Sequence, residues 1–303
     1  MFKAGIMETV NRSWSLRIGD FARAVFWLLI VGLLVFTLFG SRGNDSARAD
    51  LLKRFETERH SRVISLIHRQ ESTSVLGVEV DNHISIEDSE AVLRAIRVTP
   101  PEQPIDLILH TPGGLVLAAE QISKALVEHK GKVTVFVPHY AMSGGTMIAL
   151  AADEIVMDVN AVLGPVDPQI GGMPAGSIVN VLAMKHRDSI SDETIILADM
   201  AQKARVQVAA FITQLLLKRM PEKQAVQVAT ILSEGRWTHD FPLIVPALRE
   251  LGLPVTTDMP RLVYDLMDLY PQGNGVRPSV MYVPMRRGRD ERDAGGAPGA
   301  QDK

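Results

Sequence analysis

Apolar residues recur along this chain in two patterns, short continuous runs and longer segments with helical spacing. The runs IDLILH (105–110) and KVTVFVP (132–138) are typical of strands buried on both faces of a parallel sheet. Between them, LVLAAEQISKALVEHK (115–130) has helical spacing. After them, SGGTMIALAA (143–152) opens a helix and EIVMDV (154–159) reads as a strand. This alternation predicts βαβ crossovers and a mostly parallel α/β sheet.

Further elements flank this central block. The β-branched runs VISLIHR (63–69) and SVLGVEV (74–80) predict strands. The segment SIEDSEAVLRAIR (85–97) begins with Ser and carries early acidic residues, as in a capped amphipathic helix. After the block, residues 160–177 are rich in Gly and Pro and are predicted to be loop, whereas helical spacing returns over most of 192–232.

The N-terminal part of the chain contains an apolar run of a different kind. Residues 24–40, AVFWLLIVGLLVFTLFG, lie between Arg23 and Arg42 without a charge. Their length is near the lower end of the ~17–25 residues that span a bilayer, so we expect a single-pass transmembrane helix in contact with lipid. The alternatives are a cleaved signal peptide and a buried core helix. Basic residues flank both ends, so the side of the membrane stays open.

These patterns divide the chain into five segments. We expect an N-terminal tail, a transmembrane helix, a charged juxtamembrane linker, one α/β catalytic domain and a disordered charged tail, at residues 1–23, 24–40, 41–61, 62–286 and 287–303 respectively.

Composition excludes several classes of function. The 32 basic and 35 acidic residues are nearly balanced, which gives no sign of a nucleic-acid partner. There are no cysteines, so thiolate catalysis and Cys-ligated metals are excluded. No metal-binding or phosphate-binding spacing appears, and we expect neither a metal nor a cofactor. We expect His110 and His139 to be structural and His186 to lie on the surface.

Two glycine-rich turns carry the candidate chemistry. HTPGG (110–114) follows one buried strand, and AMSGGT (141–146) follows the next and opens a helix. At that helix N-terminus the backbone N–H groups are unpaired and the dipole is positive, and both features favour a developing oxyanion beside Ser143. The alternative is that Ser143 is an ordinary helix N-cap.

The two turns together are more specific than either alone. If the two strands are neighbours, both turns lie at the same edge of the sheet. The backbone N–H groups of Gly113 and Gly114 then converge with that of Gly144. Two such donors facing one nucleophile are the geometry that acyl transfer needs.

The segments ILHTPGG and AMSGGTMIALAADEIVM resemble the core of Clp-type serine peptidases and of signal peptide peptidase A. Taken with ALAADEIVMDVNAVLGPVDPQ, they look like the serine dehydrogenase proteinase family, which belongs to the same Clp/crotonase-like clan. The resemblance covers roughly residues 63–255. It implies a Clp/crotonase-like ββα superhelix that assembles as a homo-oligomer. Ser143 matches the nucleophile, Gly144 one donor of the oxyanion hole, and Gly113 with Gly114 the pair that supplies the other donor.

The proton acceptor departs from the Clp pattern. Clp peptidases carry a catalytic His about 25 residues after the serine, but LGPVDPQ (163–169) has none, and Asp167 is expected to be a turn residue. Signal peptide peptidases use a downstream lysine instead, and Lys203 and Lys185 match that description. We favour Lys203, since it lies at the edge of an apolar helical stripe where burial can lower its pKa.

These observations predict a membrane-anchored serine endopeptidase with a Ser-Lys dyad. Its expected partners are a peptide or membrane-protein substrate, the bilayer and further copies of itself. Two alternatives remain, a crotonase-like acyl-thioester enzyme that uses the same amides without a nucleophile, and a non-catalytic membrane scaffold of the same fold.

Overall fold

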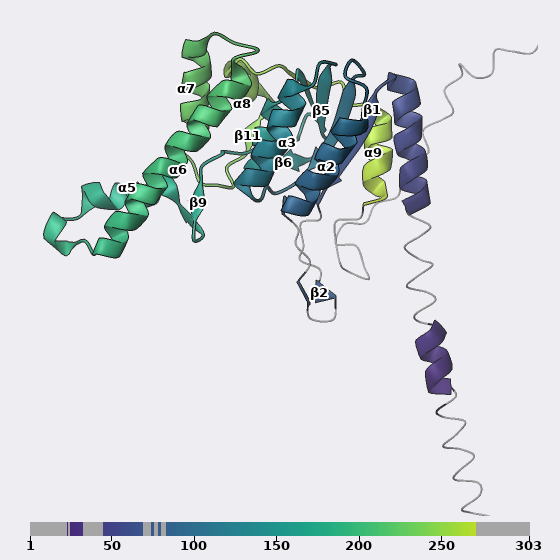
Figure 1. Cartoon of the computed structure of the whole chain (residues 1–303), viewed down its shortest axis with the longest axis horizontal. Helices are drawn as coiled ribbons and strands as arrows, with labels where there is room; N and C mark the ends of the chain where they lie inside the picture. Colours follow the sequence, from purple (N-terminus) through teal and green to yellow (C-terminus); the bar gives the residue numbers. More distant parts are fainter. Residues whose placement is uncertain are drawn as a thin grey trace, which may run out of the picture. The chain divides into compact units, whose positions relative to one another are not determined.

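The computed structural model describes residues 23, 25–32, 45–68, 74–75, 78–79 and 83–270. Within these residues, the central feature is a parallel sheet with the strand order β1-β4-β5-β7-β12 (Figure 1). Its strands are β1 (Arg62–Ile67), β4 (Ile105–His110), β5 (Val133–Val137), β7 (Glu154–Met157) and β12 (Val255–Thr256).

Strands β4 and β5 are buried along their whole length, as their apolar runs predict. Successive side chains point to opposite faces of the sheet. Leu107 and Leu109 therefore enter the main core, whereas Ile108 joins a second cluster with Phe136 on the other face. Both faces of the sheet are covered, and this explains why these strands lack a polar side.

A second, smaller sheet begins where the main strands end. It contains β6 (Tyr140–Ala141), β8 (Val162–Leu163) and β11 (Leu243–Ile244) in the order β11-β8-β6. Thr111, which directly follows β4, forms a parallel bridge to Ala141. After β5 the chain therefore runs through β6 into α4 (Gly144–Leu150), which is one ββα unit. This arrangement confirms the predicted α/β fold and places both glycine-rich turns at one edge of the sheet.

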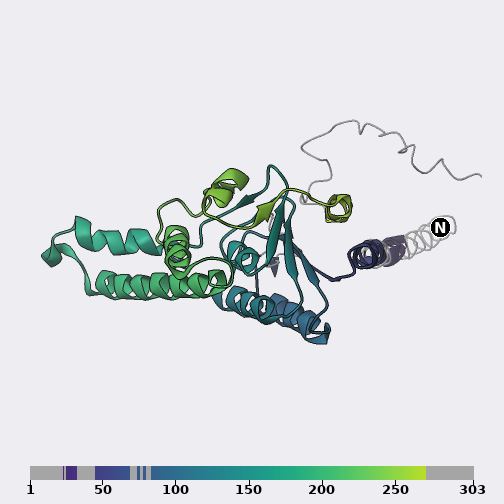
Figure 2. The ribbon, with the colours of Figure 1, turned by 90° about the horizontal axis from the view of Figure 1, so that it is seen from above.

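Helices cover both faces of the main sheet. One face packs against α2 (Ile86–Val98), α3 (Val116–Glu128) and α4. Residues 45–59 are helical and lie beside α9 (Arg261–Asp268) on the other face (Figures 1 and 2). Phe55, only 2% exposed, packs there with Phe136 and Val263.

An ion pair fixes the 45–59 helix to the sheet. The guanidinium of Arg59 donates to the carboxylate of Asp106 on β4, whose side chain is 2% exposed. The Ser61 hydroxyl donates to the same carboxylate at 2.6 Å. Much of the segment expected to be a juxtamembrane linker therefore packs as a helix against the sheet.

The chain between β8 and β11 forms a helical extension. Helices α5 (Ala175–Met184) and α6 (Asp192–Leu216) run side by side away from the sheet (Figures 1 and 2). They share a small cluster that includes Ile178 and Ala201 and is separate from the main core. The remaining elements are α7 (Glu222–Ser233), α8 (Val245–Glu250), the 3-10 turn η1 (Arg187–Ser189), and the short strands β2 (Ser74–Val75), β3 (Val78–Glu79), β9 (Gln169–Ile170) and β10 (Met173–Pro174).

Some predicted elements differ from the structure. The single strand expected over 74–80 is a hairpin of two short strands, β2 and β3. The loop expected over 160–177 contains β8, β9, β10 and the start of α5. Of the apolar run 24–40, only residues 25–32 are described. No helix in the described part of the chain is long and apolar enough to cross a membrane.

Candidate active site

Ser143 lies between β6 and α4 in a backbone conformation that few residues adopt. Its φ is 51° and its ψ is −117°, a region that favours glycine over residues with a Cβ. Its side chain makes no capping hydrogen bond to α4. The interpretation of Ser143 as an ordinary N-cap is therefore wrong, and backbone strain of this kind is characteristic of functional residues.

The other turn contacts Ser143 directly. A Cβ built on Gly113, where φ is 108°, would lie 2.8 Å from the Ser143 Cβ and 3.3 Å from the Gly144 nitrogen. A Cβ built on Gly114, where φ is 156°, would lie 2.3 Å from the Ile84 nitrogen. Only glycine fits at these two positions, since both the space and the backbone angles exclude a side chain.

Two of the three predicted oxyanion donors are available to a substrate. The N–H of Gly113 donates to the Thr111 hydroxyl at 3.2 Å. Gly114 lines the cavity described below, and its N–H donates to no described main-chain acceptor. Gly144 is the first residue of α4, so its N–H has no partner within the helix. The geometry therefore favours the amides of Gly114 and Gly144 as the two donors.

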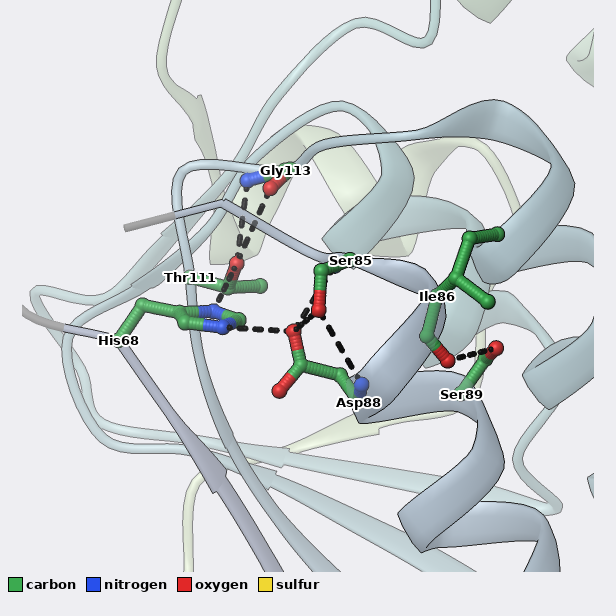
Figure 3. Close-up of polar contacts among 7 residues, drawn as sticks. All are labelled: His68, Ser85, Ile86, Asp88, Ser89, Thr111 and Gly113. Carbon is green, nitrogen blue, oxygen red and sulfur yellow. Dashed lines mark hydrogen bonds and ion pairs between the residues drawn. The ribbon is translucent and has the colours of Figure 1, made fainter. Parts of the chain in front are cut away.

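A partly buried polar network holds the Gly113 turn (Figure 3). Asp88 lies 3.2 Å from Nε2 of His68, and Nδ1 of His68 lies 2.9 Å from the Thr111 hydroxyl. When His68 is neutral and donates from Nε2 to Asp88, its Nδ1 accepts a hydrogen bond from the Thr111 hydroxyl. The oxygen of that hydroxyl in turn accepts a hydrogen bond from the Gly113 N–H. Burial would raise the pKa of Asp88, but hydrogen bonds from His68 and Ser85 outweigh it, so the pKa is lower than usual. The network fixes one turn of the site to β1 and α2.

Ser143 opens into a cavity of about 750 Å³, a size typical of small-molecule and peptide subsites. Most of its lining is apolar, from Val116, Met142, Met147, Val162, Val166 and Val208. Its polar lining includes His139, Tyr140, Asp167, Gln169, His239 and Asp240. The cavity therefore offers both apolar and polar surface to a ligand beside Ser143.

Neither predicted lysine lines this cavity. Lys203 projects from α6 with its side chain 68% exposed and pairs with Asp199 at 2.5 Å. Lys185 is the exposed C-cap residue of α5. In this arrangement neither ammonium group is buried, so a lysine base stays a prediction of the sequence. Of the histidines expected to be structural or on the surface, His110 is buried against Tyr140 and His186 is exposed.

Sequence analysis missed a histidine–aspartate pair in the same cavity. Nδ1 of His239 lies 2.8 Å from Oδ1 of Asp167, whose side chain is fully buried. The amide nitrogen of Gln169 donates to the other carboxylate oxygen at 2.7 Å. The expectation that Asp167 is only a turn residue is wrong, because it holds His239 from 72 positions away. No local motif marks a pair so far apart in sequence.

Within the described residues, no group of three or more His, Cys, Asp or Glu side chains is placed to hold a metal ion. The cavity that Ser143 lines also contains side chains of the types that transfer protons, and the N–H groups of Gly114 and Gly144 can donate to a carbonyl oxygen.

Comparisons with known proteins show what this chain is similar to. The family model described as ClpP-like SDH-type serine proteinase matches residues 16–296. An uncharacterized protein of Methanocaldococcus jannaschii is 51% identical over 266 residues, which cover 88% of this chain and 91% of that protein. A serine-to-alanine variant of the 1510-N membrane-bound stomatin-specific protease is 19% identical, with a TM-score of 0.40 over 62% of this chain and 79% of that one. ClpP1 from Listeria monocytogenes is 16% identical, with a TM-score of 0.42 over 69% and 98%.

Proposed function

Because this chain belongs to the family of ClpP-like SDH-type serine proteinases, we propose that it is a membrane-anchored serine endopeptidase with Ser143 as its nucleophile. One observation carries the proposal. The serine is held in a strained turn, and it lines one cavity with Gly114 and Gly144, whose backbone N–H groups donate to no main-chain acceptor among the described residues.

The chemistry follows from this geometry. Oγ of Ser143 attacks the peptide carbonyl carbon, and the carbonyl oxygen gains negative charge between the two amides. The donors are backbone groups in fixed turns, so they need no reorganisation as the charge develops. Collapse of the tetrahedral intermediate expels the amine and leaves an acyl-enzyme, which water then hydrolyses.

The proposed proton acceptor is a lysine, Lys203 with Lys185 as the alternative. Its support is the resemblance to lysine-dependent relatives and the residue type. A lysine base must be neutral, and its ordinary pKa of ~10.4 must fall by burial before it can accept a proton at neutral pH. Either lysine would therefore have to be covered, for example by substrate or by a second copy of the chain.

The proposed location is a membrane, with residues 24–40 as a single-pass anchor. The uncharged run between Arg23 and Arg42 supports it. A catalytic domain tethered in this way would act on peptides or membrane-protein segments close to the bilayer.

The proposed homo-oligomer has support in the exposed apolar side chains of the α5–α6 pair, which include Leu182, Ile196 and Met200.

The experiment that tests the enzymatic proposal is labelling with a fluorophosphonate, followed by mass spectrometry to find the labelled residue. We expect stable labelling of Ser143 in the full-length protein and hydrolysis of unstructured peptides. Ser143→Ala should lose both while its melting temperature stays near that of the wild type. A folded protein that takes no label would instead favour the crotonase-like or the scaffold alternative.

The anchor has a separate test. Full-length protein should stay in the membrane fraction after washing with high salt and with alkaline carbonate, and detergent should release it. A variant that lacks residues 1–42 should be soluble and folded. Release of the full-length protein by carbonate alone would contradict the anchor.

A further inference from the structure

We infer that Thr146 is a positioning residue, whose hydroxyl holds the strained turn that presents Ser143 to a substrate. The inference rests on the proposed function of Ser143 and concerns what supports that same site. Thr146 lies in the first turn of α4, three positions after the serine, and its side chain is fully buried. It is not among the residues that line the cavity, so it acts through its neighbours and not on the substrate.

The strained conformation of Ser143, with a φ of 51°, persists only if the structure around it fixes the turn. Main-chain hydrogen bonds supply part of that support. The Met142 N–H donates to the Thr111 carbonyl at 3.0 Å, and the Gly145 N–H donates to the Met142 carbonyl at 2.7 Å. Both bonds end at Met142, and neither ties α4 to the carbonyl of Ala141, the last residue of β6.

The Thr146 hydroxyl makes that connection, because it lies 2.8 Å from the Ala141 carbonyl and can donate to it. A hydroxyl inside a helix usually bonds to a carbonyl of its own helix about one turn earlier. Ser123, Thr213 and Thr230 follow this rule, each donating to the carbonyl four residues before it. Thr146 instead reaches out of its helix to the strand before the turn, so its hydrogen bond spans Ser143.

The same hydroxyl also binds the segment that follows β8. The Gly164 N–H donates to Oγ1 of Thr146 at 2.9 Å, and the Gly164 carbonyl lies 2.9 Å from Oγ1. The hydroxyl has one proton, so it serves the Ala141 or the Gly164 carbonyl while it accepts from the N–H. A Cβ built on Gly164 would lie 2.4 Å from Cε of Met142, so this segment also presses against the residue before the serine. Thr146 therefore joins the end of β6, the start of α4 and the segment after β8.

Loss of this hydroxyl should let the turn relax. The buried Gly164 N–H would have no acceptor, and nothing in the side chain would hold α4 to the Ala141 carbonyl. Ser143 could then move toward more common backbone angles. Its Oγ and the adjacent Gly144 N–H would both leave their working positions, and a misplacement of about 1 Å costs about 10²-fold in rate.

The test is the rate of fluorophosphonate labelling of Ser143 in the full-length protein, at a temperature where every variant is folded. Thr146→Val removes the hydroxyl and keeps the shape, and it should lower the maximal labelling rate by about 10- to 10²-fold. The reagent concentration that gives half of this rate should not change, because Thr146 does not line the cavity. Thr146→Ser keeps the hydroxyl and should restore most of the rate.

Two control variants separate positioning from stability. Thr213→Val is the same substitution at a hydroxyl that donates within its own helix, to the Ala209 carbonyl at 2.8 Å, and it should label at the wild-type rate. Val263→Ala removes a fully buried apolar group from the cluster on the other face of the sheet. It should lower the melting temperature without slowing labelling, so lost stability alone would not explain a slow Thr146→Val.

A second measurement does not depend on labelling. The melting temperature is compared with and without Thr146→Val, in the wild type and in Ser143→Gly. Glycine adopts the turn without strain, whereas relaxation of the turn around a serine returns part of the stability that the lost hydroxyl removes. Thr146→Val should therefore lower the melting temperature more in Ser143→Gly than in the wild type, and the difference reports the coupling between the two residues.

The outcomes distinguish the support from the nucleophile. Slow labelling of Thr146→Val that Thr146→Ser restores supports the inference. If Thr146→Val is labelled at the wild-type rate, or if Thr146→Ser is as slow as Thr146→Val, the inference is overturned and the proposed function stands. If the folded wild type takes no label, the proposed function fails and the melting temperatures decide alone, since equal losses in the two backgrounds would overturn the role of Thr146 as well.

Discussion

Replacing Thr111 with valine removes the hydroxyl that joins the glycine turn to the polar network behind it. Valine has nearly the same shape as threonine, so the change tests hydrogen bonding and not packing. Thr111 is fully buried, and its hydroxyl accepts from the Gly113 N–H at 3.2 Å and contacts His68 at 2.9 Å. With valine, the N–H of the buried Gly113 has no partner.

The expected loss of stability follows from that unpaired group. A buried donor left without an acceptor costs about 1–3 kcal/mol. His68 is 11% exposed and can take water in place of the hydroxyl, so it adds little. For a domain of this size each kcal/mol lowers the melting temperature by about 2–4 °C, and a loss of about 2 kcal/mol lowers it by about 4–8 °C.

Activity should fall more than this stability loss alone explains. Gly114 follows the released amide, so its N–H should lose alignment with that of Gly144. Removal of one oxyanion donor slows acyl transfer about 10²- to 10³-fold, and partial misalignment should give at least about tenfold at a temperature where the variant is folded.

The assay is thermal unfolding beside the labelling rate of Ser143. The matched control is Thr230→Val, since the exposed hydroxyl of Thr230 donates to the Val226 carbonyl one turn earlier in α7. It should change stability by less than about 0.5 kcal/mol. If Thr111→Val melts and reacts like this control, the network does not hold the turn and the reasoning is wrong.

Two further predictions rest on single residues. Ser143→Gly should be inactive but more stable than Ser143→Ala by about 1 kcal/mol, because alanine keeps a Cβ at φ 51° and glycine does not; equal melting temperatures of the two variants would show that the turn stores no strain. Phe55→Ala should destabilise the domain by about 3–5 kcal/mol, since the ring is 2% exposed and lies 5.5 Å from the Phe136 ring. Urea unfolding measures this loss, and a value below about 1 kcal/mol would mean that the 45–59 helix contributes little to the fold.

The sequence predicts the part of the fold that local patterns determine. The runs 105–110 and 132–138 predict central strands correctly because burial on both faces requires continuous apolar residues. The Gly and Pro content of residues 160–177 predicts a loop. Yet β8 and the start of α5 lie there, since pairing and packing with distant segments stabilise them. The two-residue strands β11 and β12 are too short to leave a periodic signal.

The candidate site also has one part that local motifs predict and one part that they do not. Ser143, Gly113, Gly114 and Gly144 belong to two short motifs, and the structure brings these motifs together. The pair of His239 and Asp167 has no motif, because it forms only after α5, α6 and α7 have brought the chain back to the sheet. The sequence pattern places Lys203 at the edge of an apolar stripe, but helical spacing alone does not say whether a neighbouring element covers that edge.

The edge strand β12 is made late in synthesis, so the main sheet is completed late as well. Val255 and Thr256 pair with Ile155 and Val156 of β7, from which they are separated by the whole helical extension. At about 5–20 residues per second, a ribosome needs about 5–20 s to make the chain between the two strands. During that time the edge of β7 has no neighbouring strand, and an apolar edge of this kind can pair with other chains. Each nascent molecule therefore passes through an interval in which aggregation competes with folding, and slower translation after residue 157 would lengthen it.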